Sequence, residues 1–309
     1  MVQVTSAMSA CPVRALGVQP LDMAAAAADP RIPPGPPGLE EIGRRRIGPF
    51  IVARRFRRAD GSEVRFTAWH HRKGHGLIDP ADTSPRPIRW WAPDRRGWWI
   101  AVLFMVGSAC FALGAFPPTA AALGSAAGYV FFIGSIFFTS AAYGQYYEAT
   151  NEGDDLEGRG RTKRLFGVRA TSLGWWACAI QLIGTVAFNI STFSVLLELS
   201  TRQEEALVWV PDMVGAACFL VASSLVIMET HDRLRGQLLR TLESRIAAIN
   251  MLGSIAFGIS ALAAFVVPLT GELANADLVN STTFVGAVLF FIGAALLIPA
   301  MRPEPASTV

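Results

Sequence analysis

The sequence "GSIFF" at residues 134–138 is one copy of a motif that recurs through the C-terminal two thirds of the chain: glycine, a small residue, two variable residues and phenylalanine. The six copies begin at Gly107, Gly134, Gly184, Gly215, Gly253 and Gly286. Positions i and i+4 share one face of a helix. In lipid, helices associate through close approach at small residues, because the hydrophobic effect cannot hold them together. The motif therefore predicts membrane helices in which a phenylalanine fills the gap at a neighbour's glycine, and packing is favoured over ligand binding as the role of the six glycines.

The composition is more apolar than that of a typical soluble domain, since 52% of the 309 residues are hydrophobic and 17% are charged. After residue 97 the chain contains six apolar stretches long enough to cross about 30 Å of hydrocarbon. They cover residues 98–116, 128–147, 174–197, 206–228, 246–269 and 281–301. We expect an all-α integral membrane protein with six transmembrane helices within residues 97–302, followed by a short cytoplasmic tail at 303–309.

The basic residues predict the orientation, because positively charged loops stay in the cytoplasm. In the expected topology all but one of the 27 basic residues lie on one side, the exception being Arg202. Both termini are therefore expected to be cytoplasmic, in the inner (plasma) membrane, with the lipid bilayer and its anionic headgroups as partners of the basic side. The start of the chain lacks the pattern of a cleavable signal peptide, so the first span is expected to act as its own insertion signal.

The six spans group into three helix pairs. Residues 97–111, "GWWIAVLFMVGSACF", align with 174–188, "GWWACAIQLIGTVAF", and more loosely with 244–257, "SRIAAINMLGSIAF". Because each pair crosses the membrane twice, successive pairs enter from the same side. We expect three parallel two-helix repeats, at residues 97–151, 174–232 and 244–302, related by an axis along the membrane normal.

The pattern F-x-G-S-x-x-F, doubled within each pair, resembles the YrhK-like domain, a small two-span bacterial membrane module that is functionally uncharacterised. The resemblance covers residues 97–302 in three copies. Gly134, Ser135 and Phe138 are nearest to the pattern, and the third copy is the weakest. The resemblance implies a fold and brings no catalytic or ligand-binding residues with it.

The N-terminal segment has a different character. Residues 1–40 are rich in Ala and Pro, which predicts a disordered tail. Residues 41–96 are expected to form a basic cytoplasmic segment with a β-hairpin, whose type I′ turn lies at Asp60-Gly61. One face of the hairpin would carry apolar residues and the other arginines. The apolar set is Val52, Phe56, Val64, Phe66 and Ala68. Nucleic-acid binding is disfavoured, because the anionic membrane surface already accounts for the basic residues.

Polar residues within the spans are the candidate functional groups, since burying them is costly. Gln181 and Asn250 each lie three residues before a motif glycine, and Asn189 follows Gly184 by about one turn. These amides could line a polar path, although hydrogen bonds between helices explain them equally well and are the favoured interpretation.

Two carboxylates, Glu148 and Glu229, each lie 14 residues after a motif glycine, at the cytoplasmic ends of their spans, and His231 accompanies Glu229. Nearby arginines favour a role in salt bridges over proton coupling. The four cysteines show neither a disulfide framework nor metal-binding spacing, so no metal and no cofactor are expected.

Two classes of function are compatible with these features. No catalytic motif is present, so an enzyme is not expected. The favoured class is a structural or interaction protein whose basic arm contacts anionic lipid, a protein partner or a second copy of the chain. The alternative is a small-solute transporter or channel that uses the polar residues of the bundle. A dry bundle with paired amides would indicate the first class, and amides around a water-accessible cavity the second.

Overall fold

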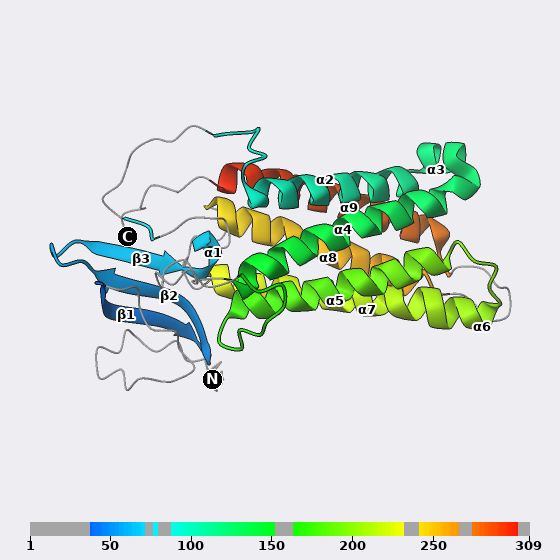
Figure 1. Cartoon of the computed structure of the whole chain (residues 1–309). Helices are drawn as coiled ribbons and strands as arrows, with labels where there is room; N and C mark the ends of the chain where they lie inside the picture. The colour runs from blue at the N-terminus through cyan, green and yellow to red at the C-terminus, as the bar shows by residue number, and fades with distance from the viewer. Residues whose placement is uncertain are drawn as a thin grey trace, which may run out of the picture.

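The computed structural model describes residues 38–71, 77–79, 88–151, 163–231, 241–265 and 274–301. Most of the tail expected at residues 1–40 and all of the tail at 303–309 lie outside the described residues. Within the described part, six helices are long and apolar enough to cross a membrane, as predicted (Figure 1). They are α2 (Arg96–Ala115), α4 (Ala127–Thr150), α5 (Leu173–Ser194), α7 (Val210–His231), α8 (Leu242–Ala263) and α9 (Ala276–Ala300). Shorter segments, α3 (Pro117–Leu123) with η1 (Gly124–Ala126) and α6 (Thr201–Glu204) with η3 (Glu205–Trp209), lead into α4 and α7.

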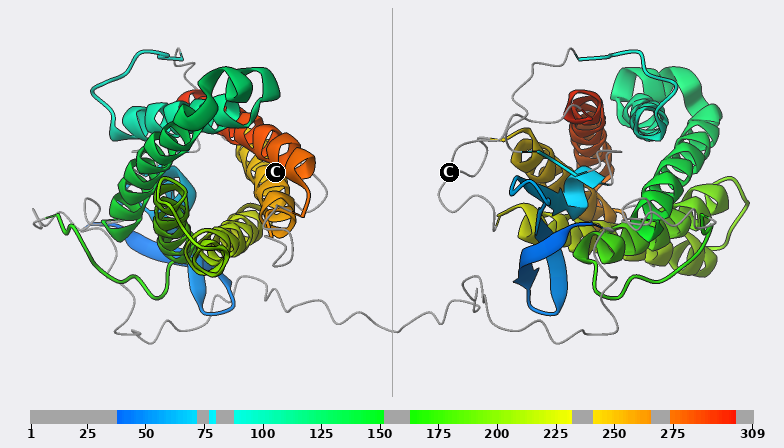
Figure 2. Two further views of the ribbon diagram at one scale, coloured as in Figure 1. Left: turned by 90° about the vertical axis from the view of Figure 1, so that its right-hand side faces the viewer. Right: turned by 60° about the vertical axis from the view of Figure 1, so that its left-hand side comes forward.

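The six long helices form a closed ring in chain order. Each packs on the next along the chain, and α9 packs back on α2. Figure 2 shows them arranged around a common axis. Two contacts close the ring where its first and last helices meet. Gly97 lies against the side chain of Met301, and Nη1 of Arg95 donates to the Met301 carbonyl oxygen at 3.2 Å. The two ends of the helical domain therefore lie together at one end of the ring.

Paired helices meet at their motif glycines. A Cβ atom added to Gly107 would lie 2.7 Å from the ring of Phe138 and 2.9 Å from the carbonyl oxygen of Gly134. A Cβ atom added to Gly134 would lie 3.1 Å from the ring of Phe111. The same reciprocal contacts recur between α5 and α7 and between α8 and α9: Gly184 with Phe219, Gly215 with Phe188, Gly253 with Phe290, and Gly286 with Phe257. Each motif phenylalanine thus lies against the glycine of its partner helix.

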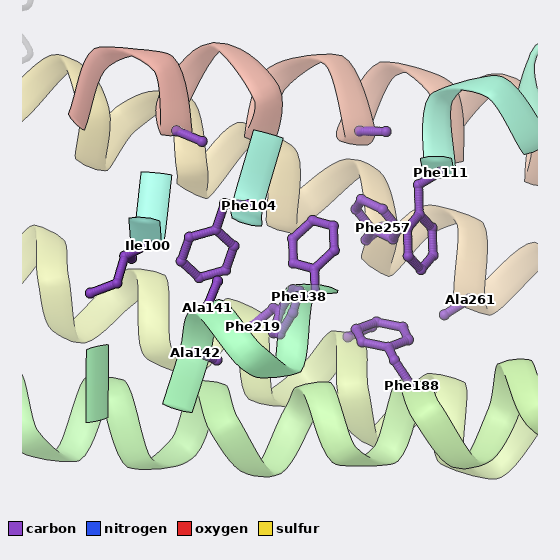
Figure 3. Packing of buried hydrophobic residues seen from close by; sticks show 13 residues of the cluster. Ile100, Phe104, Phe111, Phe138, Ala141, Ala142, Phe188, Phe219, Phe257 and Ala261 are labelled. Carbon is purple, nitrogen blue, oxygen red and sulfur yellow. The ribbon is translucent and has the colours of Figure 1, made fainter. Parts of the chain in front are cut away.

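The motif phenylalanines also contact one another inside the ring (Figure 3). Ring centroids of Phe111 and Phe257 are 5.8 Å apart, and those of Phe188 and Phe257 are 6.0 Å apart. These contacts connect the third helix pair to the first and second pairs with largely edge-to-face geometry, which aromatic rings favour. The phenylalanines form one cluster that fills the interior at mid-ring.

Hydroxyl groups join neighbouring pairs. Ser135, which follows a motif glycine on α4, hydrogen bonds to Thr192 of α5 at 2.9 Å. Ser254, which follows a motif glycine on α8, hydrogen bonds to Ser223 of α7 at 2.8 Å. Ser108 holds the corresponding place on α2, but its Oγ atom has no hydrogen-bond partner among the described residues. Two of the three boundaries between pairs therefore carry a hydroxyl contact of this kind in the part of the chain described.

A three-stranded antiparallel sheet precedes the ring, with strand order β1-β2-β3. The strands are β1 (Glu40–Ile47), β2 (Phe50–Arg57) and β3 (Glu63–Thr67). The structure contains the expected hairpin of β2 and β3, but the sequence did not predict β1, whose alternation of apolar and polar residues is weak. Glu40, the last residue of the expected tail, already pairs with Arg57 of β2.

The hairpin turn differs from the predicted two-residue type I′ turn. The last register pair is Arg57 with Glu63, so the connection has five residues, 58–62. The carboxylate of Asp60 accepts hydrogen bonds from the backbone N–H of Ser62 at 2.9 Å and from its hydroxyl at 2.6 Å. Gly61 adopts a φ of 85°, which glycine tolerates without strain. The two side-chain hydrogen bonds of Asp60 stabilise this five-residue loop, which is longer than the two-residue turn predicted from the Asp60-Gly61 dipeptide.

Two arginines, Arg44 and Arg54, lie on the apolar face of the sheet, contrary to the expected separation of faces. The register places Arg54 opposite Phe66 on β3 and Arg44 on β1. Glu41 compensates both charges, accepting from Arg54 Nη2 at 2.6 Å and from Arg44 Nε at 2.8 Å. Burial raises the pKa of Glu41, but the hydrogen bonds and charges of the two arginines outweigh it and leave the pKa below its usual value. The ion pairs make an arginine tolerable among the buried side chains.

The sheet is attached to the end of the ring where Arg95 and Met301 meet. The backbone N–H of Ile51 donates to the Thr171 carbonyl oxygen, just before α5, at 3.0 Å. After β3 the chain forms α1 (Ala68–His71), and Trp69 of this turn packs with Trp98 and Ile246. Trp69 is thereby inserted between the sheet and the helix ends.

The glycine contacts predict a stability difference. Gly107→Ala should destabilise the protein by about 1–3 kcal/mol, because the added methyl group collides with the backbone of α4 as well as with Phe138. Thermal unfolding in detergent measures this change. Gly258→Ala on α8 is the control, since its Cβ atom would meet only Leu220, at 3.4 Å. Equal Tm values for both variants would contradict the packing role of Gly107.

Candidate functional site

A cavity of about 110 Å³ lies inside the ring at the end that faces the sheet. Its lining includes the first residues of α2 and α5 and the last turns of α4 and α9. Trp69 of α1 lines it from the sheet side, and Phe104, Phe138 and Phe290 line it from the aromatic cluster. The cavity is therefore bounded by the aromatic cluster at one end and by Trp69 at the other.

Three amide side chains line this cavity: Gln145 from α4, Gln181 from α5 and Asn250 from α8. None of the three side chains makes a hydrogen bond to another described residue. Asn250 fits because its neighbour on α9 is Gly293, where a Cβ atom would collide with the amide oxygen. Since each amide offers both donors and an acceptor, their unused hydrogen-bonding capacity is directed at the cavity.

The walls come from equivalent positions of the three helix pairs. In α2, α5 and α8, the residue three positions before the motif glycine lines the cavity. These residues are Phe104, Gln181 and Asn250. The residues seven positions before the same glycines also line it, and they are Ile100, Ala177 and Ile246. In α4, α7 and α9, the residue eleven positions after the motif glycine lines the cavity: Gln145, Val226 and Leu297. Equivalent faces of the three helix pairs thus form the cavity. At these equivalent positions some pairs have an amide side chain and the others have an apolar one.

The structure separates the predicted site residues. Gln181 and Asn250 are brought together at the cavity, but Asn189 does not line it. The Oδ1 atom of Asn189 is buried and has no hydrogen-bond partner among the described residues. The six motif glycines lie at helix contacts and likewise do not line the cavity. Only two of the three intramembrane amides named from the sequence therefore share a site.

The two carboxylates also occupy different environments. Glu148 lines the cavity and forms an ion pair with Nη1 of Arg96 at 3.2 Å. Its side chain is 20% exposed and that of Arg96 51% exposed. Glu229 is buried on α7 and does not line the cavity. His231 ends α7, and its side chain lies outside the described residues.

Among the described residues no group of three His, Cys, Asp or Glu side chains could hold a metal ion.

Among the cavity residues not identified from the sequence, three carry an amide, a thiol or an indole group: Gln145, Cys178 and Trp69. Gln145 could have been found, because eleven residues are close to three helical turns and place it on the same face as Gly134. Cys178 was considered only together with the other cysteines, which show neither a disulfide framework nor metal-binding spacing. Trp69 could not have been found, since its place depends on how the sheet packs on the ring.

The fold and site define a class: a closed ring of six apolar helices with a partly polar cavity at the end that carries a small sheet. Comparisons of the chain with protein families, with curated proteins and with solved structures find no match. The resemblance to the YrhK-like domain is therefore neither supported nor contradicted by them and stays a prediction from the sequence.

The amides predict how stability responds to substitution. Gln181→Leu should change the free energy of unfolding by less than about 0.5 kcal/mol, because no protein hydrogen bond is lost. Asn151→Leu is the comparison, since Asn151 donates to Tyr147 and Arg164 and accepts from the Arg164 N–H at 2.8 Å. That variant should lose about 1–3 kcal/mol, because it leaves backbone groups unsatisfied. Unfolding of both variants in detergent measures the difference, and a large loss for Gln181→Leu would instead indicate a structural amide.

Proposed function

We propose that this is a multi-pass membrane protein whose helix ring holds a cavity for a small polar solute, reached from the cytoplasm. Membrane insertion of the six helices is supported by their outer surface, which carries large exposed apolar side chains. Ile183 is 59% exposed, Leu252 54% and Leu262 63%. A continuous apolar surface of this kind is not stable in water, whereas in hydrocarbon it is solvated.

The orientation and the repeats belong to the same proposal. An even number of spans returns the chain to its starting side, and the sheet with its arginines lies there, which supports a cytoplasmic location of the sheet and both termini. The recurrence of the glycine and phenylalanine contact in α2–α4, α5–α7 and α8–α9 supports three tandem repeats of a two-helix module. A module of this type is what the YrhK-like resemblance implies.

The solute-binding role rests on one observation: Gln145, Gln181 and Asn250 converge on one cavity without hydrogen bonds to other described residues. The three amides are half-buried among apolar walls, where polar groups need hydrogen-bond partners, so their convergence supports water or a polar solute as the partner. An engineered apolar cavity of about 150 Å³ binds benzene, so a space of about 110 Å³ suits a molecule of a few heavy atoms. The aromatic cluster closes the far end, as in a carrier open to one side. The proposed role is binding and passage, with no covalent step.

Cysteine accessibility tests this proposal. In a protein without native cysteines, Gln181→Cys and Asn250→Cys should react with a small membrane-impermeant thiol reagent applied from the cytoplasmic side, because both positions line the cavity. Asn189→Cys is the matched control on α5 and should be protected. Labelling is measured by mass spectrometry in oriented membranes.

Two outcomes would contradict the solute-binding role. One is protection of Gln181→Cys and Asn250→Cys in protein that is folded, which would leave a dry bundle. The other is equal reactivity of Asn189→Cys, which would mean that labelling reports general opening of the helices.

A second role is supported by the sheet. On the face opposite Arg54, the register gathers Arg45, Arg46, Arg55, Arg57 and Arg65. Arg46, Arg57 and Arg65 are exposed. Such a basic face suits anionic headgroups, which attract basic residues by up to about 1 kcal/mol each. The sheet would then dock the protein to the inner leaflet, and an acidic protein partner or a second copy of this chain is the alternative occupant.

The lipid role predicts a change in lipid preference. Arg57→Gln should lower the ratio of phosphatidylglycerol to phosphatidylcholine co-purified from mixed bilayers by up to about fivefold, because one headgroup contact is lost. Lipid mass spectrometry measures the ratio, and Arg202→Gln, at the other end of the ring, is the control. An unchanged ratio in a folded variant that also carries Arg46→Gln and Arg65→Gln would favour a protein partner.

A further inference from the structure

The chemistry of the cavity walls narrows the class of solute, and this inference rests on the proposed solute-binding role. The hydrogen-bonding groups are amides from three different helices: Gln145, Gln181 and Asn250. Each offers an N–H₂ donor and a carbonyl acceptor. A solute that carries both donors and acceptors can satisfy these groups, whereas one with only acceptors or only donors leaves some of them unsatisfied.

The walls contain one charged side chain, and its ion-pair partner lies outside the lining. Among the described residues that line the cavity, Glu148 is the only charged one. Its carboxylate is held by Arg96 at 3.2 Å, so the pair presents no net charge. An ionic solute would lose part of its hydration without meeting an unpaired counter-charge among the described wall residues, which is costly in a partly enclosed and largely apolar space. The pairing of Glu148 therefore disfavours cations, and the lack of a basic side chain among the described wall residues disfavours anions.

The remaining walls are apolar and aromatic. Phe104, Phe138 and Phe290 lie at the inner end and Trp69 at the outer end. These surfaces suit the faces or methyl groups of a compact molecule, while the amides bind its polar edge. The volume of about 110 Å³ limits its size to a few heavy atoms.

We infer that the cavity binds a small uncharged molecule that both donates and accepts hydrogen bonds, such as a short carboxamide or a polyol, and that it discriminates against ions of the same size. The selectivity comes from amides without counter-charges on three helices, and the size limit from the aromatic cluster and Trp69.

Cys178 provides a native probe of occupancy, because this thiol lines the cavity. The test uses the full chain in detergent with Cys11, Cys110 and Cys218 replaced by alanine, and follows the alkylation rate of Cys178 with a small neutral thiol reagent. The competitors are acetamide, acetate and acetamidinium, which have the same heavy-atom skeleton size and carry zero, negative and positive charge. All are compared at equal ionic strength.

Acetamide at roughly 100 mM should slow the labelling about threefold to tenfold, because ligands of so few atoms bind in the millimolar range or more weakly. Acetate and acetamidinium should leave the rate within twofold of the control. Asn250→Leu should abolish protection by acetamide, measured as the ratio of the rates of that variant without and with acetamide, and Asn189→Leu should preserve that ratio.

The possible failures are distinguishable. Equal or stronger protection by either ion, or no protection by acetamide while Cys178 reacts, would overturn this inference and leave an accessible cavity intact. Absence of reaction at Cys178, together with protection of Asn250→Cys from labelling, would overturn the solute-binding role and this inference with it.

Discussion

The contact between a glycine on one helix and a phenylalanine on its partner is the constraint on which the rest of the ring depends. The backbones of α2 and α4 approach so closely that a Cβ atom on Gly107 would lie 2.9 Å from the carbonyl oxygen of Gly134. In a membrane, close approach of this kind replaces the hydrophobic effect as the source of helix association. The contact also fixes the direction of Phe111 and Phe138, which cover the opposite glycine and reach the ring interior.

The aromatic cluster and the cavity are two consequences of that arrangement. Three pairs bring six phenylalanines together, and their volume fills the interior at mid-ring. Toward the sheet, the same helix faces carry smaller side chains. Ala177 stands where the other pairs have Ile100 and Ile246, and the second residues of α2 and α5 are Gly97 and Gly174. The walls no longer supply enough volume to fill the centre, and a cavity remains there.

Local pattern was sufficient to predict the helices and the hairpin, but not the features that depend on packing between distant segments. Six apolar stretches of sufficient length fix six helices, whatever their order around the ring. The closure of the ring, the strand β1 and the place of Trp69 arise from long-range contacts that no sequence window contains. Arg54 shows the same limit. Its charge predicts an exposed side chain, and only the register brings Glu41 close enough to neutralise it on the buried face. For the site, Gln181 and Asn250 were identified because burying amides is costly anywhere, whereas Asn189 carries the same signal without facing the cavity.

Differences between the three helix pairs separate packing from function more clearly than their similarities do. Glycine and phenylalanine recur in all six motif copies, because the two helices of every pair approach each other closely at these positions. At the cavity, the residues at equivalent positions differ between the three helix pairs. Gln181 and Asn250 stand where the first pair has Phe104, and Gln145 stands where the others have Val226 and Leu297. Packing alone would favour apolar side chains at all these positions. Phe104, Val226 and Leu297 show that apolar side chains fit there. Local departures from an otherwise consistent pattern are expected where function imposes its own requirement, and here each departure introduces an amide directed at the same cavity.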